Sequence, residues 1–174
     1  MVYAKTFKHY IAGLADARGS FLLSWRQEYH RAIPALSNEP LPTLIKSHFT
    51  IRLRGRGEKD EDDYSTLLMV QQHLSCGFIR RGVITSGYSQ CGTAYHYCSL
   101  TVSSIADAVT KIIPFFDNYQ LYSSTRKKFE IWRDGIILFD KVRRRRRYLK
   151  TLTIPWTGKE LEEMDIIIRL LQDA

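Results

Sequence analysis

The sequence lacks the cysteine, histidine and apolar patterns that mark three common classes of protein. Its three cysteines, Cys76, Cys91 and Cys98, lack the paired spacing of a zinc site, so we expect reduced thiols in a reducing compartment and no disulfide framework. The five histidines are dispersed, and we interpret each as a solvated or core side chain. No run of about 18 apolar residues and no secretory signal occurs, so a membrane is not an expected partner.

What the sequence does have is positive charge on a chain of globular composition. Its 174 residues are 44% hydrophobic, which is enough for one domain with a sizeable core. The net charge of +8 favours an anionic partner, and nucleic acid in particular.

Five consecutive arginines, Arg143 to Arg147, form the densest basic run of the chain. Like charges repel one another, so we expect the run to stay solvated or disordered unless phosphates neutralise it. We interpret it as a phosphate-binding segment, with a sorting signal as the alternative.

Small residues crowd one short segment near the N-terminus. Within Tyr10–Ser20, about two and a half helical turns carry Ala12, Gly13, Ala15, Ala17 and Gly19. A helix this thin approaches another backbone closely, and packing on a partner helix would offset its weak helix propensity. We expect Gly19 to end the helix and a strand to follow it.

Residues 11–19 match a known nine-residue motif at Ala12, Gly13, Leu14, Asp16, Ala17 and Gly19. The pattern resembles that of the LAGLIDADG homing endonucleases and their RNA maturase relatives. At the eighth position, where active members carry an acid that holds divalent metal ions, this chain has Arg18. Arginine stays protonated and repels cations, so the departure predicts lost metal binding. The resemblance implies a structural role for Asp16.

The order of predicted elements extends the resemblance. Strands are expected over Ser20–Gln27, Lys46–Arg54, Gly77–Ile84 and Thr93–Leu100. Further helices are expected over Tyr64–Leu74, Ser103–Ile113, Thr125–Leu138 and Gly158–Gln172. The block Ile112–Asp117, followed by Leu121 and Phe129–Trp132, is similar to the segment that closes the family's repeat.

The resemblance thus implies the LAGLIDADG homing-endonuclease-like fold, an α+β fold with an αββαββα core and a curved antiparallel four-stranded sheet. We place this domain at 1–140. We interpret 141–174 as the basic run and a C-terminal amphipathic helix that packs on the domain or extends it.

In the family that this chain resembles, the polar face of the sheet lies on nucleic acid. There, arginine forks can meet phosphates or guanine edges, and aromatic rings can stack on unpaired bases. The predicted nucleic-acid-binding residues are Ser24, Arg26, His48, Thr50, Arg52, Arg54, Arg80, Arg81, His96, Arg126, Lys127, Arg143, Arg144, Arg145, Arg146 and Arg147. The strands expected over Gly77–Ile84 and Thr93–Leu100 form a hairpin, and the sequence leaves open which of their alternate residues face the nucleic acid. Tyr95 and Tyr97 therefore belong either to this face or to the core. The predicted helix interface consists of Ala12, Gly13, Asp16 and Ala17.

A second departure concerns a base that working members carry near the start of the helix after Leu121. An ungapped comparison puts that position at Ser124 or Thr125, and a shift of one or two residues offers Arg126 or Lys127. We therefore assign no catalytic residue and no metal site.

The leading hypothesis is a LAGLIDADG protein that has lost endonuclease activity and binds structured RNA. It would act as a maturase-like intron cofactor or as a component of an organellar ribosome or other ribonucleoprotein. The alternative is a homing endonuclease that makes metal-dependent double-strand cuts in a long DNA target, and only that alternative requires Mg²⁺. A structural dimerisation module is the third hypothesis.

One motif copy implies that pairing must come from a homodimer or from packing on another protein through the motif helix. Two converging Arg18 side chains would disfavour a homodimer without phosphate between them. Lys5 and Lys8, with no acid before Asp16, superficially resemble an organelle presequence. Because the motif begins so early, we favour a mature or organelle-encoded start, and the resemblance implies a mitochondrial or other organellar location.

Overall fold

Four antiparallel strands form one sheet in the order β1-β2-β4-β3. The strands are β1 (Gly19–Arg26), β2 (Leu44–Arg54), β3 (Phe78–Thr85) and β4 (Ala94–Val102). The computed structural model describes residues 2–26, 44–54, 60–85, 94–149 and 156–174. The predicted strands are confirmed, with ends that shift by one or two residues. The long predicted loop after β1 lies outside the described residues.

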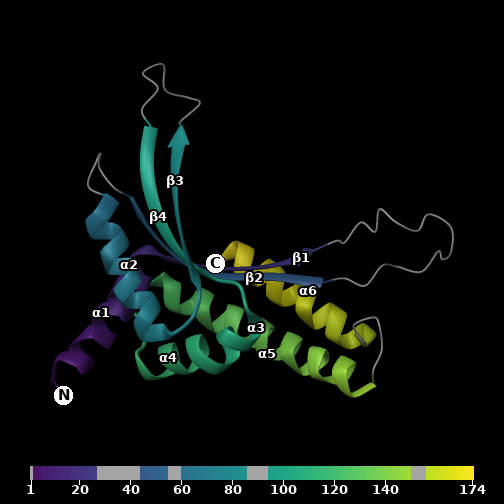
Figure 1. The fold of residues 1–174 in the computed structure, drawn as a ribbon. Helices are drawn as coiled ribbons and strands as arrows, with labels where there is room; N and C mark the ends of the chain where they lie inside the picture. Colours follow the sequence, from purple (N-terminus) through teal and green to yellow (C-terminus); the bar gives the residue numbers. More distant parts are fainter. Residues whose placement is uncertain (1, 27–43, 55–59, 86–93, 150–155) are drawn as a thin grey trace.

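Helices cover one face of the sheet and leave the other face open (Figure 1). They are α1 (Val2–Arg18), α2 (Asp60–Leu74), α3 (Ile105–Asp107), α4 (Ile113–Asn118), α5 (Ser124–Leu149) and α6 (Gly158–Asp173). A π-helical turn, Ala108–Ile112, joins α3 to α4. The expected αββαββα order is confirmed, and α1 ends immediately before Gly19 as predicted.

Two helix predictions were wrong. A helix was expected to end at Ile113, but helical structure continues through α4 to Asn118, and Pro114 lies in the first turn of α4. Helix α5 was expected to end at Leu138, and the arginine run beyond it to stay solvated or disordered. Instead α5 continues through the run to Leu149, because the run is tied to acidic residues described below.

Side-chain alternation along β2 decides which face of the sheet is buried. Phe49 and Ile51 are fully buried, whereas Arg52 and Arg54 are exposed on the other side. Trp132 of α5, also fully buried, donates a hydrogen bond from Nε1 to Oγ of Ser47 at 3.0 Å. The core therefore lies between the sheet and α5, as the apolar alternation of β2 predicted.

Helix α6 packs on α5 and against the edge strand β1. A capping box begins it, in which Thr157 and Glu160 each accept a hydrogen bond from the other's backbone N–H. Helix α5 runs unbroken across residue 140, and the division into 1–140 and 141–174 stays a prediction.

No helix in the described ranges is long and apolar enough to cross a lipid bilayer. The thiols of Cys76 and Cys98 are buried, and Cys91 lies outside the described residues. Burial raises the pKa of Cys76 to about 11, so this thiol stays protonated at neutral pH.

Candidate nucleic-acid interface

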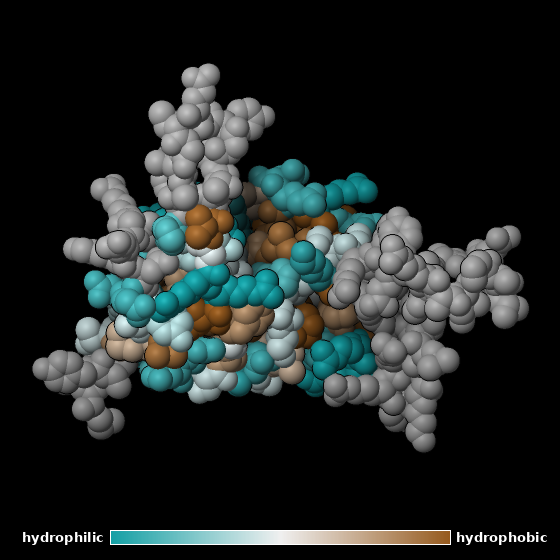
Figure 2. Space-filling model, turned by 45° about the horizontal axis from the view of Figure 1, so that its top comes forward, coloured by the Kyte–Doolittle hydropathy of each residue, from teal (hydrophilic) through white to brown (hydrophobic). Residues whose placement is uncertain are grey.

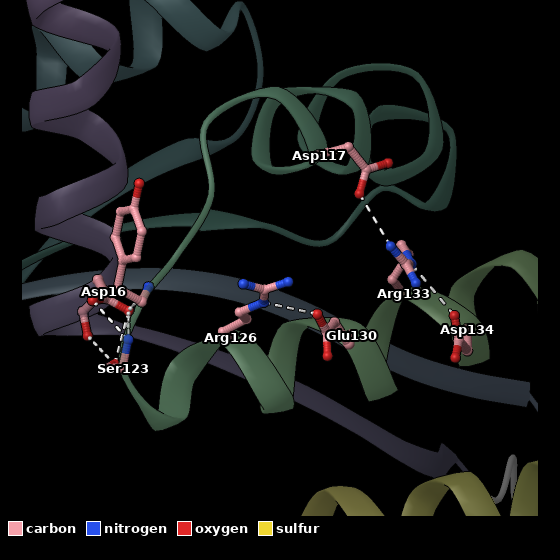
Figure 3. A network of polar contacts seen from close by, with 8 residues as sticks. Asp16, Asp117, Ser123, Arg126, Glu130, Arg133 and Asp134 are labelled. Atoms are coloured by element: carbon pink, nitrogen blue, oxygen red, sulfur yellow. Dashed lines mark hydrogen bonds and ion pairs between the residues drawn. The ribbon is translucent and has the colours of Figure 1, made fainter.

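Asp16 joins the end of α1 to the start of α5 (Figure 3). Its carboxylate accepts hydrogen bonds from the backbone N–H groups of Tyr122 and Ser123, at 3.3 and 3.0 Å, and from Oγ of Ser123 at 2.8 Å. In return, Thr125 donates from Oγ1 to the backbone carbonyl of Asp16 at 3.0 Å. The carboxylate thus satisfies backbone donors that precede α5, and a structural role for Asp16 stays a prediction.

The end of α1 does not fit a divalent metal ion. Arg18 is exposed at the motif position where the resemblance implies an acid, and its fixed positive charge opposes a cation. Asp16 is the acid of the motif, and its carboxylate already accepts hydrogen bonds from the donors described above. The hydroxyl of Thr125, one of the two ungapped positions for a base, is likewise engaged with α1. No group of three or more potential ligands forms elsewhere in the described residues.

The four predicted interface residues of α1 do not share one environment. Gly13 and Ala17 are exposed, and Asp16 is half-buried. Ala12 is 4% exposed and packs within the chain. The prediction that Ala12 meets a partner was therefore wrong, because the inward face of α1 is covered by the protein's own core.

The open face of the sheet is basic. It is formed by alternate residues of each strand, as the pairing register shows, and its described side chains include Ser24, Lys46, His48, Thr50, Arg52, Arg54, Phe78, Arg80, Tyr97, Ser99 and Thr101. None of the four strands carries an aspartate or a glutamate. In Figure 2, hydrophilic residues interleave with hydrophobic ones on the side of the molecule that it shows. A carboxylate-free surface of this kind attracts phosphate.

Two arginines of the open face lie over aromatic rings. The guanidinium of Arg52 is 5.1 Å from the ring centre of Tyr97, and that of Arg80 is 5.0 Å from the ring centre of Phe78. These distances fall within cation–π range. We call these four residues the arginine–aromatic cluster. Tyr97 therefore belongs to the open face, which settles one of the alternatives left by the sequence; the side chain of Tyr95 lies outside the described residues.

His48 and Thr50 occupy the middle of the open face on β2. Thr50 Oγ1 lies 3.3 Å from Oγ1 of Thr101 on β4, so the two hydroxyls share a hydrogen bond. Burial lowers the pKa of His48 below its usual 6.5, and the positive charges of Lys46 and Arg80 lower it further. Its Nδ1 is buried, and no hydrogen-bond partner reaches it within the described part of the chain.

Arg81 and His96 were placed on the wrong face. Because successive strand residues point to opposite sides, Arg81 faces away from Arg80. It lies 4.0 Å from the ring centre of Tyr64 on α2 and forms two hydrogen bonds with the carboxylate of Glu61, at 3.1 and 3.3 Å. His96 shares this helix-covered side, since it pairs with Val83. The side chain of Arg26 lies outside the described residues.

The arginine run divides into residues with different partners. Arg145 forms an ion pair with the largely buried carboxylate of Glu160 on α6. Arg144 pairs with Asp140 one turn earlier in α5, at 2.7 Å, but its own side chain stays 70% exposed. Arg143 is half-buried. The side chains of Arg146 and Arg147 lie outside the described residues.

Burial opposes the charge of Glu160, but hydrogen bonds from Arg145 and Thr157 outweigh it and hold the pKa of that carboxyl below its usual value. Nearer the start of α5, Arg126 pairs with Glu130 at 3.0 Å (Figure 3), and Lys127 is exposed. Neither residue belongs to the open face of the sheet, so the predicted binding residues occupy at least two separate surfaces.

Sequence reasoning missed Phe78 and Lys46 as members of the interface. Lys46 could have been found from the alternation of β2, because it lies two residues before His48. Phe78 could have been found once the hairpin register was known, because it lies two residues before Arg80. The acidic partners of Arg81 and Arg145 could not be found in this way. They come from α2 and α6, and no local spacing brings them to the arginines.

The model of the LAGLIDADG endonuclease family matches residues 11–136. The match covers the motif itself, the whole sheet and the first half of α5, so the chain belongs to the LAGLIDADG endonuclease family. The predicted fold is likewise confirmed.

Solved structures of the same family share the fold at low identity. The meganuclease I-SmaMI bound to an uncleavable DNA is 19% identical with a TM-score of 0.62; the match covers 93% of this chain and 43% of that one. The LAGLIDADG homing endonuclease I-GzeII in complex with its DNA target is 20% identical with a TM-score of 0.60, covering 92% of this chain and 43% of that one. This chain thus spans less than half the length of either protein. No curated protein matches it.

Proposed function

We propose that this chain binds structured RNA through the open face of its sheet and does not cut nucleic acid. The observation that carries the proposal is the open face itself, whose strands bring Lys46, Arg52, Arg54 and Arg80 together without a carboxylate. Such a surface can neutralise a phosphate backbone, because no carboxylate of the strands competes with phosphate for the basic side chains.

The loss of cleavage rests on the end of α1. Metal-dependent nucleases of this kind need carboxylates that hold cations beside the scissile phosphate. Here Arg18 brings a permanent positive charge, and Asp16 already accepts three hydrogen bonds from donors of Tyr122 and Ser123. A symmetric dimer would repeat this arrangement in both halves.

The preference for RNA rests on the kind of side chains present. Guanidinium groups make bidentate contacts to phosphate and stack on bases, which suits folded RNA with unpaired segments. The role we propose is that of a maturase-like intron cofactor or a component of an organellar ribonucleoprotein such as a ribosome. A mitochondrial or other organellar location is part of the same proposal.

We also propose that α1 packs on a second copy of the chain or on another protein. A Cβ atom built on Gly13 would meet nothing within 4 Å, so the fold of this chain leaves room for alanine there. Glycine costs about 0.5–1 kcal/mol relative to alanine inside a helix. We therefore expect Gly13→Ala to stabilise the isolated chain by that amount in urea denaturation and Gly13→Leu to weaken association in sedimentation. Unchanged association in Gly13→Leu would contradict packing through this face.

Two assays test the proposed function together. Nucleic acid that copurifies with the protein from its native source should be RNA when it is cross-linked and sequenced. Purified protein should leave a library of duplex DNA targets uncut in the presence of Mg²⁺. Cutting that is abolished by chelation and by Asp16→Asn would overturn the proposal.

DNA is the second candidate target, because the solved structures that share this fold include DNA complexes. In that case the chain would be a homing endonuclease or a binding-only descendant, and another subunit or domain would have to supply the acid that Arg18 replaces. Copurification of a specific duplex DNA would favour this candidate.

A further inference from the structure

We propose that the arginine–aromatic cluster, formed by Arg52, Tyr97, Phe78 and Arg80, is a stacking site for unpaired RNA bases. The inference rests on the proposed function and specifies which part of an RNA the open face recognises. It assigns the flat surfaces of the cluster to bases and leaves the remaining basic residues of the face to phosphates.

The ring of Tyr97 lies across the neighbouring strand. A Cβ added at Gly82, its partner on β3, would be 2.6 Å from both Cζ and Oη of Tyr97. A residue with a Cβ at this position would have to displace the ring, so Gly82 leaves the space that the ring fills. The tyrosine thus covers two strands of the open face, which is a broad flat surface for stacking.

The arginines extend this surface. Arg52 and Arg80 both pair with Ser99, from opposite sides of β4. Ser99 is 4% exposed although it lies on the open face, so its neighbours cover it. Arg52 inclines toward Tyr97, and Arg80 inclines toward Phe78. Both arginines are exposed, which leaves their outer planar faces to a base.

The charges on the cluster also favour this ligand. Arg81, which is adjacent to Arg80 in sequence, is held by a bidentate carboxylate on the opposite face. Among the described residues, no acid pairs with Arg52 or Arg80. An incoming nucleotide can therefore place its base on the cluster and its phosphate near these guanidinium groups.

A paired helix cannot use these surfaces. In a duplex the bases are stacked on one another and present only their edges, whereas an unpaired base exposes its π-face to aromatic rings and guanidinium planes. The cluster should therefore discriminate between single-stranded and paired RNA, while the phosphate-binding residues should not.

The test compares the wild type with Tyr97→Leu/Phe78→Leu, with Tyr97→Phe as the variant that keeps the ring. Each is titrated into a 12-nucleotide single-stranded RNA with a central 2-aminopurine and into a blunt RNA duplex of the same sequence. Wild type and Tyr97→Phe should quench the 2-aminopurine. The double variant should lose the quenching and about tenfold or more in affinity for the single strand, since stacking contributes about 1–3 kcal/mol per base.

Affinity of the double variant for the duplex should change by less than about twofold. Retained quenching, or equal losses on the two RNAs, would overturn the stacking site and leave the proposed function standing. If the wild type binds neither RNA, the proposed function itself is wrong. Circular dichroism of both variants checks that each is folded.

Discussion

Asp16 shows how a residue of a metal-binding motif can connect two helices of the fold. It lies two residues before Arg18, and its carboxylate contacts backbone donors 106 and 107 residues later in the chain. The contact links α1 to α5 at the point where the motif helix ends. A motif match alone therefore does not show which of its acids is available to a cation.

The first prediction concerns the stability that this carboxylate provides. Asp16→Ala removes the acceptor for two backbone N–H groups and a hydroxyl. We expect a loss of about 1–3 kcal/mol in the free energy of unfolding, measured by urea denaturation. Glu162→Ala, a change at an exposed acid of α6, should stay within about 0.5 kcal/mol. If Mg²⁺ raised the melting temperature of the wild type but not of Asp16→Ala, a metal role would replace the structural one.

His48 should make RNA binding depend on pH. Burial, with Lys46 and Arg80 nearby, keeps its pKa below 6.5, so the free protein holds it neutral at pH 7. Phosphate near the ring would favour the protonated form and raise this pKa, so the complex binds more protons than the free protein. Affinity should therefore rise about three- to tenfold as the pH falls from about 7.5 to 5.5. His48→Gln should remove most of this dependence in binding titrations. A variant whose pH profile equals that of the wild type would contradict the role of His48.

The sequence predicted the residues of β2 better than any others. Its apolar and polar positions alternate over Phe49–Arg54, and the buried and exposed faces follow that order. The hairpin was predicted with correct strands but with an unresolved parity, because Arg80 and Arg81 offer similar side chains to either face. Only the register with β4 separates them.

Among the elements, α5 departs most from the sequence-based expectation. The helix was expected to end before its arginines, which were expected to stay solvated or disordered, yet the helix includes them. Local repulsion is offset by the pairs with Asp140 and Glu160, and the second of these depends on α6 packing alongside. A long-range contact of this kind has no signal in the spacing of the run.

The arginines of the run should consequently differ in role, one stabilising the fold and others binding nucleic acid. Arg145→Gln leaves the carboxylate of Glu160 largely buried without its ion partner, so we expect a loss of about 1–3 kcal/mol in the free energy of unfolding. Arg144→Gln removes an ion pair within one helix turn whose arginine is 70% exposed, although the carboxylate of Asp140 is 14% exposed, so it should cost about 1 kcal/mol.

For the affinity for RNA, the order of the two variants should reverse, so that Arg144→Gln has the larger effect. Arg144→Gln should lower affinity for a structured RNA about two- to fivefold, because the exposed guanidinium is available to phosphate. Equal loss of stability in both variants, measured by urea denaturation, would show that the run acts as a single structural unit.

At the scale of the whole molecule, the basic side chains of the strands lie on both sides of one sheet. Helices cover the side that carries Arg81, and the acid from α2 neutralises it there. The other side keeps its arginines without carboxylates in the strands. Net charge predicted an anionic partner, but it could not say which surface meets that partner, because charge composition carries no information on strand parity.

The adjacent pair Arg80 and Arg81 gives the most direct test of this account. Arg80→Gln and Arg81→Gln change the net charge equally and lie at consecutive positions of β3, but on opposite faces of the sheet. Dissociation constants for a structured RNA would be measured for both across a series of salt concentrations. Arg80→Gln should weaken binding about three- to tenfold and reduce the salt slope by about one, while Arg81→Gln should match the wild type. Equal effects, or a larger effect of Arg81→Gln, would contradict the open face as the nucleic-acid interface.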